Sequence, residues 1–431
     1  MAGARESDLV RLAGFPKGID NLSREESTPR GALRAAVNVD LDSTGKLSRR
    51  EGFALLQSLP GLHSLFADDR FPFLVGADAN TLYLFDDTLQ RTAAVTLQRD
   101  APLHYALNLF GLFYSNGTDC GMIDLAGQRR PWSAPQPAGQ PTLTVNPIAG
   151  GLTAGAYQLA ITFLDADGME SGANNASWID VPEGGGIVLT DWPEMPADAA
   201  AVNIYLSPAN GDLMYLVDTL RPALPPSYLL GRRTSGKALS TLFLTPMPPA
   251  TMLCVSNGRL FGNHQGTLIW SESLNYGLTK RSENWVQFPA ISLIADASGN
   301  GLFVASENRT YFMEGTSPAQ WRRRVVHTSG AVPGTRIYLS ASSVGLDAPG
   351  VVPVWLSTGG DLIAGLPDGS IARLHKDTYI APENAEHGGV ALREHNGINQ
   401  LLVTHKGGQI SRLQAQDSVS VEVCRNGVVV G

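Results

Sequence analysis

Short apolar runs separated by Gly, Asn and Asp turns recur along most of this chain, and they restrict its fold more than any other feature. Residues 73–76 and 81–85 flank one such turn, and the same arrangement returns at 259–270 and 301–313. Paired apolar runs around these turns are typical of β-hairpins. Once the segment 137–250 is set aside, the hairpins recur about every 40 residues, a period typical of β-propellers and related arrays. We therefore predict an all-β fold, a β-propeller of about six or seven blades, with a pair of β-sandwiches as the alternative.

The segment 137–250 differs from its surroundings and predicts a separate domain. Proline is frequent at both of its borders, between 131 and 141 and again between 246 and 249. Within it, residues 156–163 alternate as in a strand with one buried face. Short strands with regular turns over such a segment favour an inserted immunoglobulin or fibronectin-III-like β-sandwich. The predicted domains are an extended N-terminal arm at 1–36, a first propeller part at 37–136, the inserted β-sandwich at 137–250 and a second propeller part at 251–431.

The predicted arm at 1–36 carries turn signals around Pro16 and Pro29 but no lasting strand or helical period. We expect a strap that becomes ordered on a neighbouring subunit, and a loose terminus is the alternative. Strand pairing is expected to begin after it, because residues 37–41 alternate between apolar and polar side chains before a turn.

Composition and charge argue against several classes of protein. The net charge of −8 gives no basic surface of the kind that binds nucleic acid. An acidic channel wall would instead let DNA slide, since each neutralised phosphate adds affinity. Cys120, Cys254 and Cys424 are far apart and lack metal-ligand spacing, which favours buried thiols and a reducing compartment. No stretch resembles a signal peptide or a membrane helix, so we expect synthesis in a cytoplasm and no membrane partner.

Motifs that carry chemistry are missing from the sequence, which predicts no catalytic residues, no cofactor and no metal. There is no Gly-x-Ser-x-Gly, no P-loop, no His-Glu-x-x-His and no Gly-x-Gly-x-x-Gly after a predicted strand. Asp165 and Asp167 resemble the start of a calcium loop, but the twelfth position, Ala176, lacks the required carboxylate. His387 and His395 lack the spacing of a zinc site. A glycosidase needs two converging carboxylates, whereas the acids of this chain lie mostly in predicted turns.

Clusters of arginine supply the candidate contact residues. Arginine pairs occur at 49–50, 129–130 and 232–233, and a triplet occurs at 322–324. Such clusters are most often solvated surface, but arginine is favoured where one subunit meets an acidic patch of the next. We predict intersubunit contacts at Arg49, Arg50, Trp321, Arg322, Arg323 and Arg324. Trp285 and Tyr311 are further candidates, with core packing as the alternative.

Two stretches of the chain carry a resemblance to a known group of proteins. The first covers residues 34–40 and 45–53, and the second covers 257–262, 270–273 and 291–315. They resemble virion structural proteins of tailed bacteriophages, in particular tail nozzle or hub proteins and neck proteins that stabilise packaged DNA. The chain departs from this group in being shorter than many nozzle proteins.

The resemblance implies a structural subunit, not an enzyme. Members of the group are propellers that form rings, often six-fold, around the DNA channel, so it implies a homo-oligomeric ring beneath a portal or adaptor protein. Such a ring in the tail or neck of the virion would retain packaged DNA and conduct it during ejection, without sequence-specific binding. Two alternatives stay open: a host-adhesion propeller that binds or cleaves surface glycans, and a bacterial propeller scaffold for protein partners.

Overall fold

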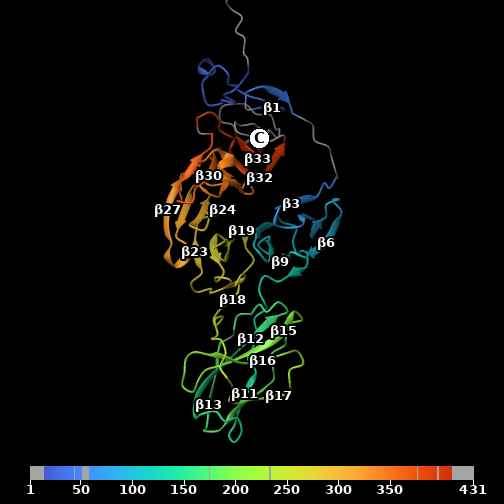
Figure 1. Ribbon diagram of the computed structural model, residues 1–431, viewed down its shortest axis with the longest axis vertical. Helices are drawn as coiled ribbons and strands as arrows, with labels where there is room; N and C mark the ends of the chain where they lie inside the picture. The colour runs from blue at the N-terminus through green and yellow to red at the C-terminus, as the bar shows by residue number, and fades with distance from the viewer. Residues whose placement is uncertain are drawn as a thin grey trace, which may run out of the picture. The chain divides into compact units, whose positions relative to one another are not determined.

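The computed structural model describes residues 14–42, 44–50, 58–173, 175–232, 234–375, 377–395 and 398–409. Within these ranges nearly every regular element is a β-strand, and the helical elements are three short 3-10 turns (Figure 1). Five four-stranded antiparallel sheets form blades in the described part of the chain, and two more sheets form a sandwich. The predicted fold class, an all-β propeller with an inserted β-sandwich, is confirmed. The chain divides into two compact units, residues 61–287 and residues 1–60 together with 288–431.

Three blades belong to the unit 61–287, and each is an antiparallel meander. The predicted hairpin at 73–85 is confirmed, since Leu74 pairs with Phe85 and Asp78 with Thr81. Buried side chains such as Leu82 and Leu112 form one core shared by the first two blades. The strands of these blades are β3 (Leu62–Phe66), β4 (Leu74–Asp78), β5 (Thr81–Phe85) and β6 (Arg91–Thr96); β7 (His104–Leu107), β8 (Gly111–Ser115), β9 (Cys120–Asp124) and β10 (Arg129–Arg130); and β19 (Thr251–Ser256), β20 (Arg259–His264), β21 (Thr267–Trp270) and β23 (Trp285–Gln287).

Two blades belong to the other unit. Every residue of β25 is buried, because a central strand that is covered on both faces loses the alternation of a half-buried strand. Phe303 packs against Phe312 and Trp355, with ring centroids 5.0 and 5.5 Å away, so aromatic side chains join the two blades. Their strands are β24 (Ile291–Asp296), β25 (Gly301–Ser306), β26 (Thr310–Glu314) and β27 (Arg322–His327), followed by β28 (Ile337–Ser340), β29 (Val351–Leu356), β30 (Leu362–Gly365) and β31 (Ile371–Arg373).

Two hairpins from distant parts of the sequence meet in this same unit. They consist of β1 (Val39–Leu41) with β2 (Leu47–Arg49), and β32 (Glu383–His395) with β33 (Ile398–Gln409). Asp40 Oδ2 lies 3.5 Å from Arg393 Nη1, and Asp40 Oδ1 accepts a hydrogen bond from Gln400 Nε2. Polar side chains therefore tie the first hairpin of the unit to its last one.

Residues 14–36, which the sequence assigns to an arm, pack against their own unit. Ile19 is buried and forms a parallel bridge with Leu33. Asn21 Nδ2 donates to the backbone oxygen of Ile380 at 2.9 Å, and its backbone N–H donates to Thr378. This part of the predicted strap thus finds its partners within the chain. Residues 1–13 lie outside the described residues, as do residues 51–53 of the first resembling stretch.

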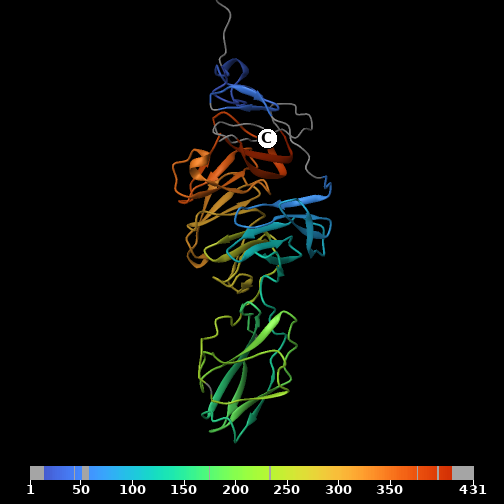
Figure 2. The ribbon, with the colours of Figure 1, turned by 45° about the vertical axis from the view of Figure 1, so that its right-hand side comes forward.

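The inserted sandwich consists of two sheets whose inner faces share one core. The alternation at 156–163 is confirmed, since Leu159 and Ile161 point into that core while Thr162 lies on the opposite face. The sheets are β11 (Thr142–Asn146), β14 (Gly186–Thr190) and β17 (Ser227–Leu230), facing β13 (Ser177–Val181), β12 (Gly155–Asp165), β15 (Ala199–Leu206) and β16 (Tyr215–Leu220). Their strands are the green arrows of Figures 1 and 2.

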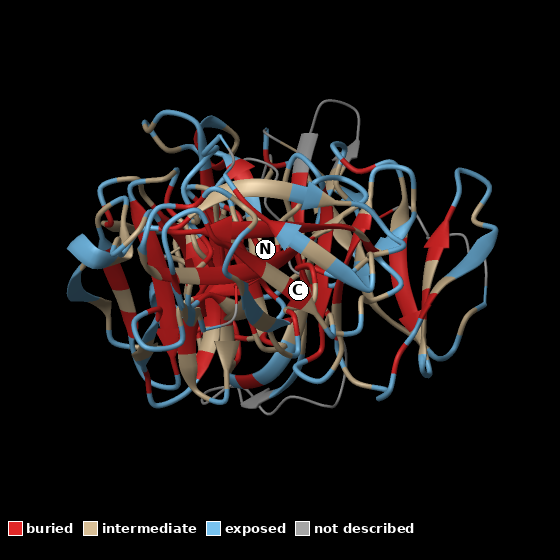
Figure 3. Cartoon of the chain, turned by 90° about the horizontal axis from the view of Figure 1, so that it is seen from below, coloured by how far each residue is buried: buried red, intermediate tan, exposed pale blue. Residues whose placement is uncertain are grey.

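Burial follows this architecture closely. Buried residues gather in the strands, and exposed residues gather in the connecting loops (Figure 3). Cys254 is buried and Cys120 is half-buried, and neither forms a disulfide bond, whereas Cys424 lies outside the described residues. In the described residues no helix is long and apolar enough to span a membrane. The same residues contain no group of three or more His, Cys, Asp or Glu side chains placed to bind a metal ion.

Candidate functional site

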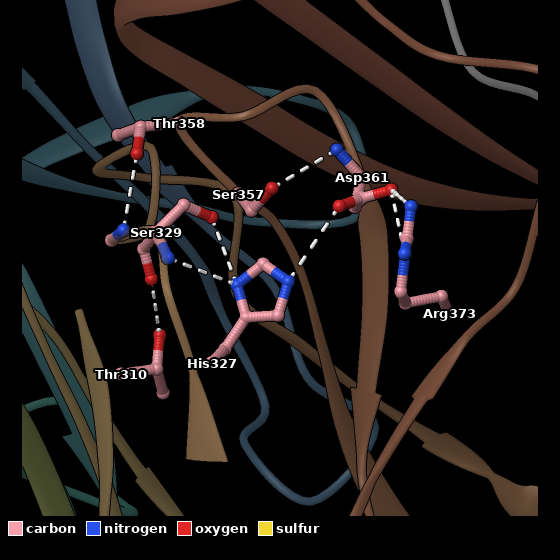
Figure 4. A network of polar contacts seen from close by, with 8 residues as sticks. Thr310, His327, Ser329, Ser357, Thr358, Asp361 and Arg373 are labelled. Atoms are coloured by element: carbon pink, nitrogen blue, oxygen red, sulfur yellow. Dashed lines mark hydrogen bonds and ion pairs between the residues drawn. The ribbon is translucent and has the colours of Figure 1, made fainter. Parts of the chain in front are cut away.

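A polar cluster that joins the β24–β27 blade to the β28–β31 blade is the best-defined candidate site. We call it the clamp, and it consists of His327, Ser329, Asp361 and Arg373. His327 is the last residue of β27, Asp361 lies in the turn between β29 and β30, and Arg373 ends β31. Figure 4 shows the imidazole ring of His327 between Ser329 and Asp361, with Arg373 on the far side of Asp361.

The turn that carries Asp361 owes its shape to a glycine. Gly360 has a φ of +83° and donates its N–H to the backbone oxygen of Ser357. A Cβ atom at Gly360 would lie 2.2 Å from the backbone oxygen of Ala381, so no other residue fits without a shift of the backbone. Ser357 Oγ then accepts the backbone N–H of Asp361 at 2.9 Å, which fixes the backbone from which the carboxylate extends.

The distances within the clamp show which nitrogen of the imidazole ring accepts a hydrogen bond and which carries the proton. The backbone N–H of Ser329 donates to His327 Nδ1 at 3.2 Å, and Ser329 Oγ lies 2.9 Å from the same nitrogen. Because a backbone N–H can only donate, Nδ1 is the acceptor and the proton of the neutral ring is on Nε2. Nε2 faces Asp361 Oδ2 at 3.6 Å. This distance is too long for a good hydrogen bond, so the contact is mainly electrostatic.

Asp361 remains charged because its partners outweigh its burial. Arg373 donates to Asp361 Oδ1 through Nε at 2.9 Å and through Nη2 at 2.7 Å. Burial alone raises the pKa of the Asp361 carboxyl, but the contacts from His327 and Arg373 hold that pKa below its ordinary value. The clamp therefore contains a carboxylate that is shared between two blades.

The linker between the two blades is also held through its backbone. Gly330 N–H donates to Thr358 Oγ1 at 3.1 Å, and the backbone N–H of Thr358 donates to the oxygen of Gly330. On the other side, Thr310 Oγ1 donates to the backbone oxygen of Ser329 at 2.9 Å. Each blade thus binds the linker through the turn between its two central strands.

Serine, histidine and aspartate together invite comparison with a nucleophilic triad, but the geometry favours a structural role. A triad base must accept the proton of the nucleophile through a free lone pair. Here the lone pair of His327 Nδ1 already receives the backbone N–H of Ser329, only two residues away. Asp361, which would orient the base, is bound by Arg373 as well. These contacts cross-link two blades and leave no nitrogen ready for proton transfer.

The same kind of contact recurs in two other blades. In the turn between β8 and β9, Asp119 accepts the backbone N–H groups of Gln98 and Arg99, and Asn116 Nδ2 donates to the oxygen of Arg99. At the end of β20, His264 Nδ1 lies 2.8 Å from the backbone oxygen of Pro249. The chain therefore uses polar side chains at the end of a central strand to hold the linker that precedes the blade.

A second polar network, which the sequence analysis missed, lies on the outer face of the sandwich. The side chain of Glu170 is 8% exposed, and its Oε1 accepts hydrogen bonds from Thr162, Asn203 and Tyr205. Lys237 Nζ lies 2.8 Å from the other oxygen. Burial raises the pKa of the Glu170 carboxyl, but these four donors outweigh it and lower that pKa below its ordinary value. The carboxylate ties the segments around residues 170 and 237 to the sheet.

The predicted contact residues of β27 lie on an exposed edge. β27 is the last strand of its sheet, and Arg322, Arg323 and Arg324 are all exposed. The guanidinium carbon of Arg323 lies 5.4 Å from the ring centre of Tyr311, and that of Arg324 lies 5.1 Å from the ring centre of Phe312. Trp321 is half-buried and donates its indole N–H to Gly315.

The arginine pair at 49–50 divides between surface and interior. Arg49 is exposed, whereas Arg50 is buried and its Nε lies 3.1 Å from Asp40 Oδ1. Because neighbouring residues at a strand end point in opposite directions, the two arginines cannot face one partner together. Arg50 is thus used inside the chain, and its guanidinium is not available to a neighbouring subunit.

Comparisons with known proteins complete the description. No family model matches the sequence, and no curated protein matches it. Among solved structures, the chain is similar to BBS1N in complex with ARL6DN, with 10% identity over 86% of this chain and 84% of that chain and a TM-score of 0.35. It is also similar to the Dos1 propeller, with 11% identity over 88% of this chain and 80% of that chain and a TM-score of 0.32. Kluyveromyces lactis Hsv2 is similar with 11% identity over 83% of this chain and 88% of that chain and a TM-score of 0.29. The blades of this chain are defined by its own strand pairing.

Proposed function

We propose that this protein is a rigid, non-enzymatic subunit of a larger assembly, and that the assembly is a ring in the tail or neck of a bacteriophage virion. The observation that carries the proposal is the exposed arginine edge of β27 on a blade that is fixed by the clamp. The phage setting comes from the resemblance of the two sequence stretches described above.

Rigidity is the first requirement for a subunit that surrounds DNA under pressure. Backbone groups within each blade are paired with the neighbouring strands. The clamp adds side-chain contacts between two blades, and similar contacts recur at Asp119 and His264. A mechanical role suits a fold in which both strands and linkers are fixed in this way.

An interface is the second requirement, and the β27 edge supplies one. Arg323 and Arg324 are held over aromatic rings, so less side-chain entropy is lost when a partner binds them. Arginine binds carboxylates with two hydrogen bonds, and a chain of net charge −8 offers carboxylates on its other copies. A contact between two different surfaces of identical subunits closes into a ring when the rotation permits it.

The acidic balance of the chain suits contact with moving DNA. Affinity for DNA grows with each phosphate that a lysine or arginine neutralises. A channel wall that binds many phosphates would therefore hold the DNA back. A ring with a net negative charge would guide DNA without holding it. The remaining partners in this proposal are a portal or adaptor protein and other tail proteins.

Electron microscopy of the purified full chain, with Arg322→Glu as the test variant, examines this proposal. Wild type is expected to form closed rings with β27 in the subunit interface, and Arg322→Glu is expected to shift the rings to monomers. Arg281→Glu is the matched control, since it makes the same charge change at another exposed arginine and should leave the rings intact. Wild type that stays monomeric at every concentration, and that also fails to bind phage tail particles, would contradict the proposal.

A further inference from the structure

A cavity of about 390 Å³ lies between the segment that leaves the sandwich and the loop that follows β21. The two segments are joined by the short strand pair β18 (Thr245–Pro246) and β22 (Leu278–Thr279). This volume is within the range of small-molecule sites, about 300–1,000 Å³. The side chains that matter for the argument are Phe243, Glu272, Ser273, Asn275 and Lys280.

Phe243 is the unusual residue of this cavity. Its side chain is 60% exposed, and its backbone has a φ of +64°, a left-handed conformation that favours glycine or asparagine. It occupies the third position of a turn closed by the N–H of Leu244 and the oxygen of Thr241. Residues in such conformations occur at binding sites, and here the exposed ring adds an apolar surface that a ligand could contact.

The polar side of the cavity is fixed and electrically balanced. Glu272 Oε1 accepts a hydrogen bond from Asn284 at 2.8 Å, and its Oε2 lies 3.3 Å from Arg259. Lys280 Nζ lies 2.5 Å from Glu283 Oε1. Each charge thus has a partner of opposite sign, and each carboxylate oxygen keeps capacity for a further hydrogen bond. Such a site suits an uncharged ligand that carries many hydroxyl groups.

We propose that this cavity binds a hexose unit of a carbohydrate. The ring of Phe243 would cover the C–H face of the sugar, and Glu272, Asn275 and Lys280 would bind its hydroxyl groups. Glycosidic hydrolysis needs two carboxylates that flank the bond, whereas Glu272 is the one acidic side chain among the described residues that line the cavity. The site is therefore assigned to binding without cleavage. The proposal does not rest on ring formation.

Saturation-transfer NMR on the full chain tests this proposal, with glucose, galactose, mannose and N-acetylglucosamine as separate probes. Wild type is expected to give saturation transfer to at least one of the four sugars. Phe243→Gly is expected to reduce that signal at least tenfold. Because glycine accepts the left-handed conformation, the variant keeps the fold, and its melting temperature should equal or exceed that of wild type.

Leu274→Gly is the matched control for this variant. Leu274 is 75% exposed and has a φ of +59°, but it does not line the cavity. The control is expected to bind as wild type does. Equal loss of binding in both glycine variants, or no saturation transfer from wild type to any of the four sugars, would overturn the proposal.

Resins made of the corresponding polymers separate the two sources of such a sugar. Retention of wild type on amylose, agarose or mannan, and release by the free hexose, would identify a unit of a polysaccharide as the ligand. Saturation transfer to the free sugar without retention on its polymer would identify a free sugar. Both results support the site.

Discussion

Replacement of His327 by alanine tests whether the clamp stabilises the junction of its two blades. The side chains of His327 and Asp361 are 13% and 12% exposed, so water screens their contact only weakly. The variant removes the acceptor of the Ser329 N–H and one partner of the Asp361 carboxylate. A donor left without its hydrogen bond costs about 1–3 kcal/mol, and the 3.6 Å contact adds less. We expect the free energy of unfolding to fall by about 2 kcal/mol.

A double-mutant cycle isolates the part of this effect that belongs to the pair. Asp361→Ala also releases Arg373, which is 43% exposed, so that ion pair contributes less than about 1 kcal/mol. The coupling between His327→Ala and Asp361→Ala is expected to be about 1 kcal/mol. Arg373→Ala is the control and should cost less than about 1 kcal/mol.

Urea unfolding and hydrogen exchange are the measurements for the cycle. Exchange should become faster at the amides of Gly330 and Val332, whose bonds to Thr358 and Leu356 hold the linker. The folded pKa of Asp361 is lowered, so the contribution of its carboxylate is complete above the ordinary aspartate pKa of about 4 and is lost as the pH falls through the lower folded value. If the two substitutions add within about 0.3 kcal/mol and exchange at the linker is unchanged, the clamp does not join the blades.

Three further substitutions test other parts of the structure. Gly360→Ala is expected to lower the free energy of unfolding by about 2 kcal/mol or more, because φ is +83° and the new Cβ meets a backbone oxygen at 2.2 Å; Gly359→Ala, where the nearest atom is 3.4 Å away, should change the melting temperature little. Glu170→Gln should destabilise the sandwich by about 3 kcal/mol in urea unfolding, since an amide cannot accept hydrogen bonds from all four donors. Glu183→Gln is the control at an exposed glutamate and should change the free energy of unfolding little. Phe243→Gly should raise the free energy of unfolding by about 1 kcal/mol, and a lower melting temperature would contradict the strain assigned to that turn.

The hairpins and the sandwich could be predicted because their signals are local. Alternation at 156–163 and the turn after residue 76 depend only on neighbours in the sequence, and the observed registers follow them. The inner strand Gly301–Ser306 is buried on both faces, so it shows no alternation, but its glycine and asparagine turns still mark its ends. Local pattern and tertiary structure agree at these places.

The clamp and the Glu170 network could not be predicted because their partners are distant in sequence. His327 and Asp361 come from different blades, and the donors to Glu170 come from two strands and a loop. Local sequence predicts a turn at 357–360 directly before Asp361, but it leaves the partner of that carboxylate unknown. Polar residues at or just after the end of a central strand hold the preceding linker in three blades, and this recurrence acquires a meaning only from the geometry.

Strand geometry also restricts how a partner can bind the β27 edge. Neighbouring residues of a strand alternate between its faces, so Arg322 and Arg324 share one face and Arg323 lies on the other. The rings agree with this division, since Arg323 lies over Tyr311 and Arg324 over Phe312. A partner that uses all three arginines must therefore grip the strand along its edge, from both faces. The same strand ends at His327, where the clamp fixes it to the next blade. The residue that stabilises the junction thus also holds in position the edge that we assign to assembly.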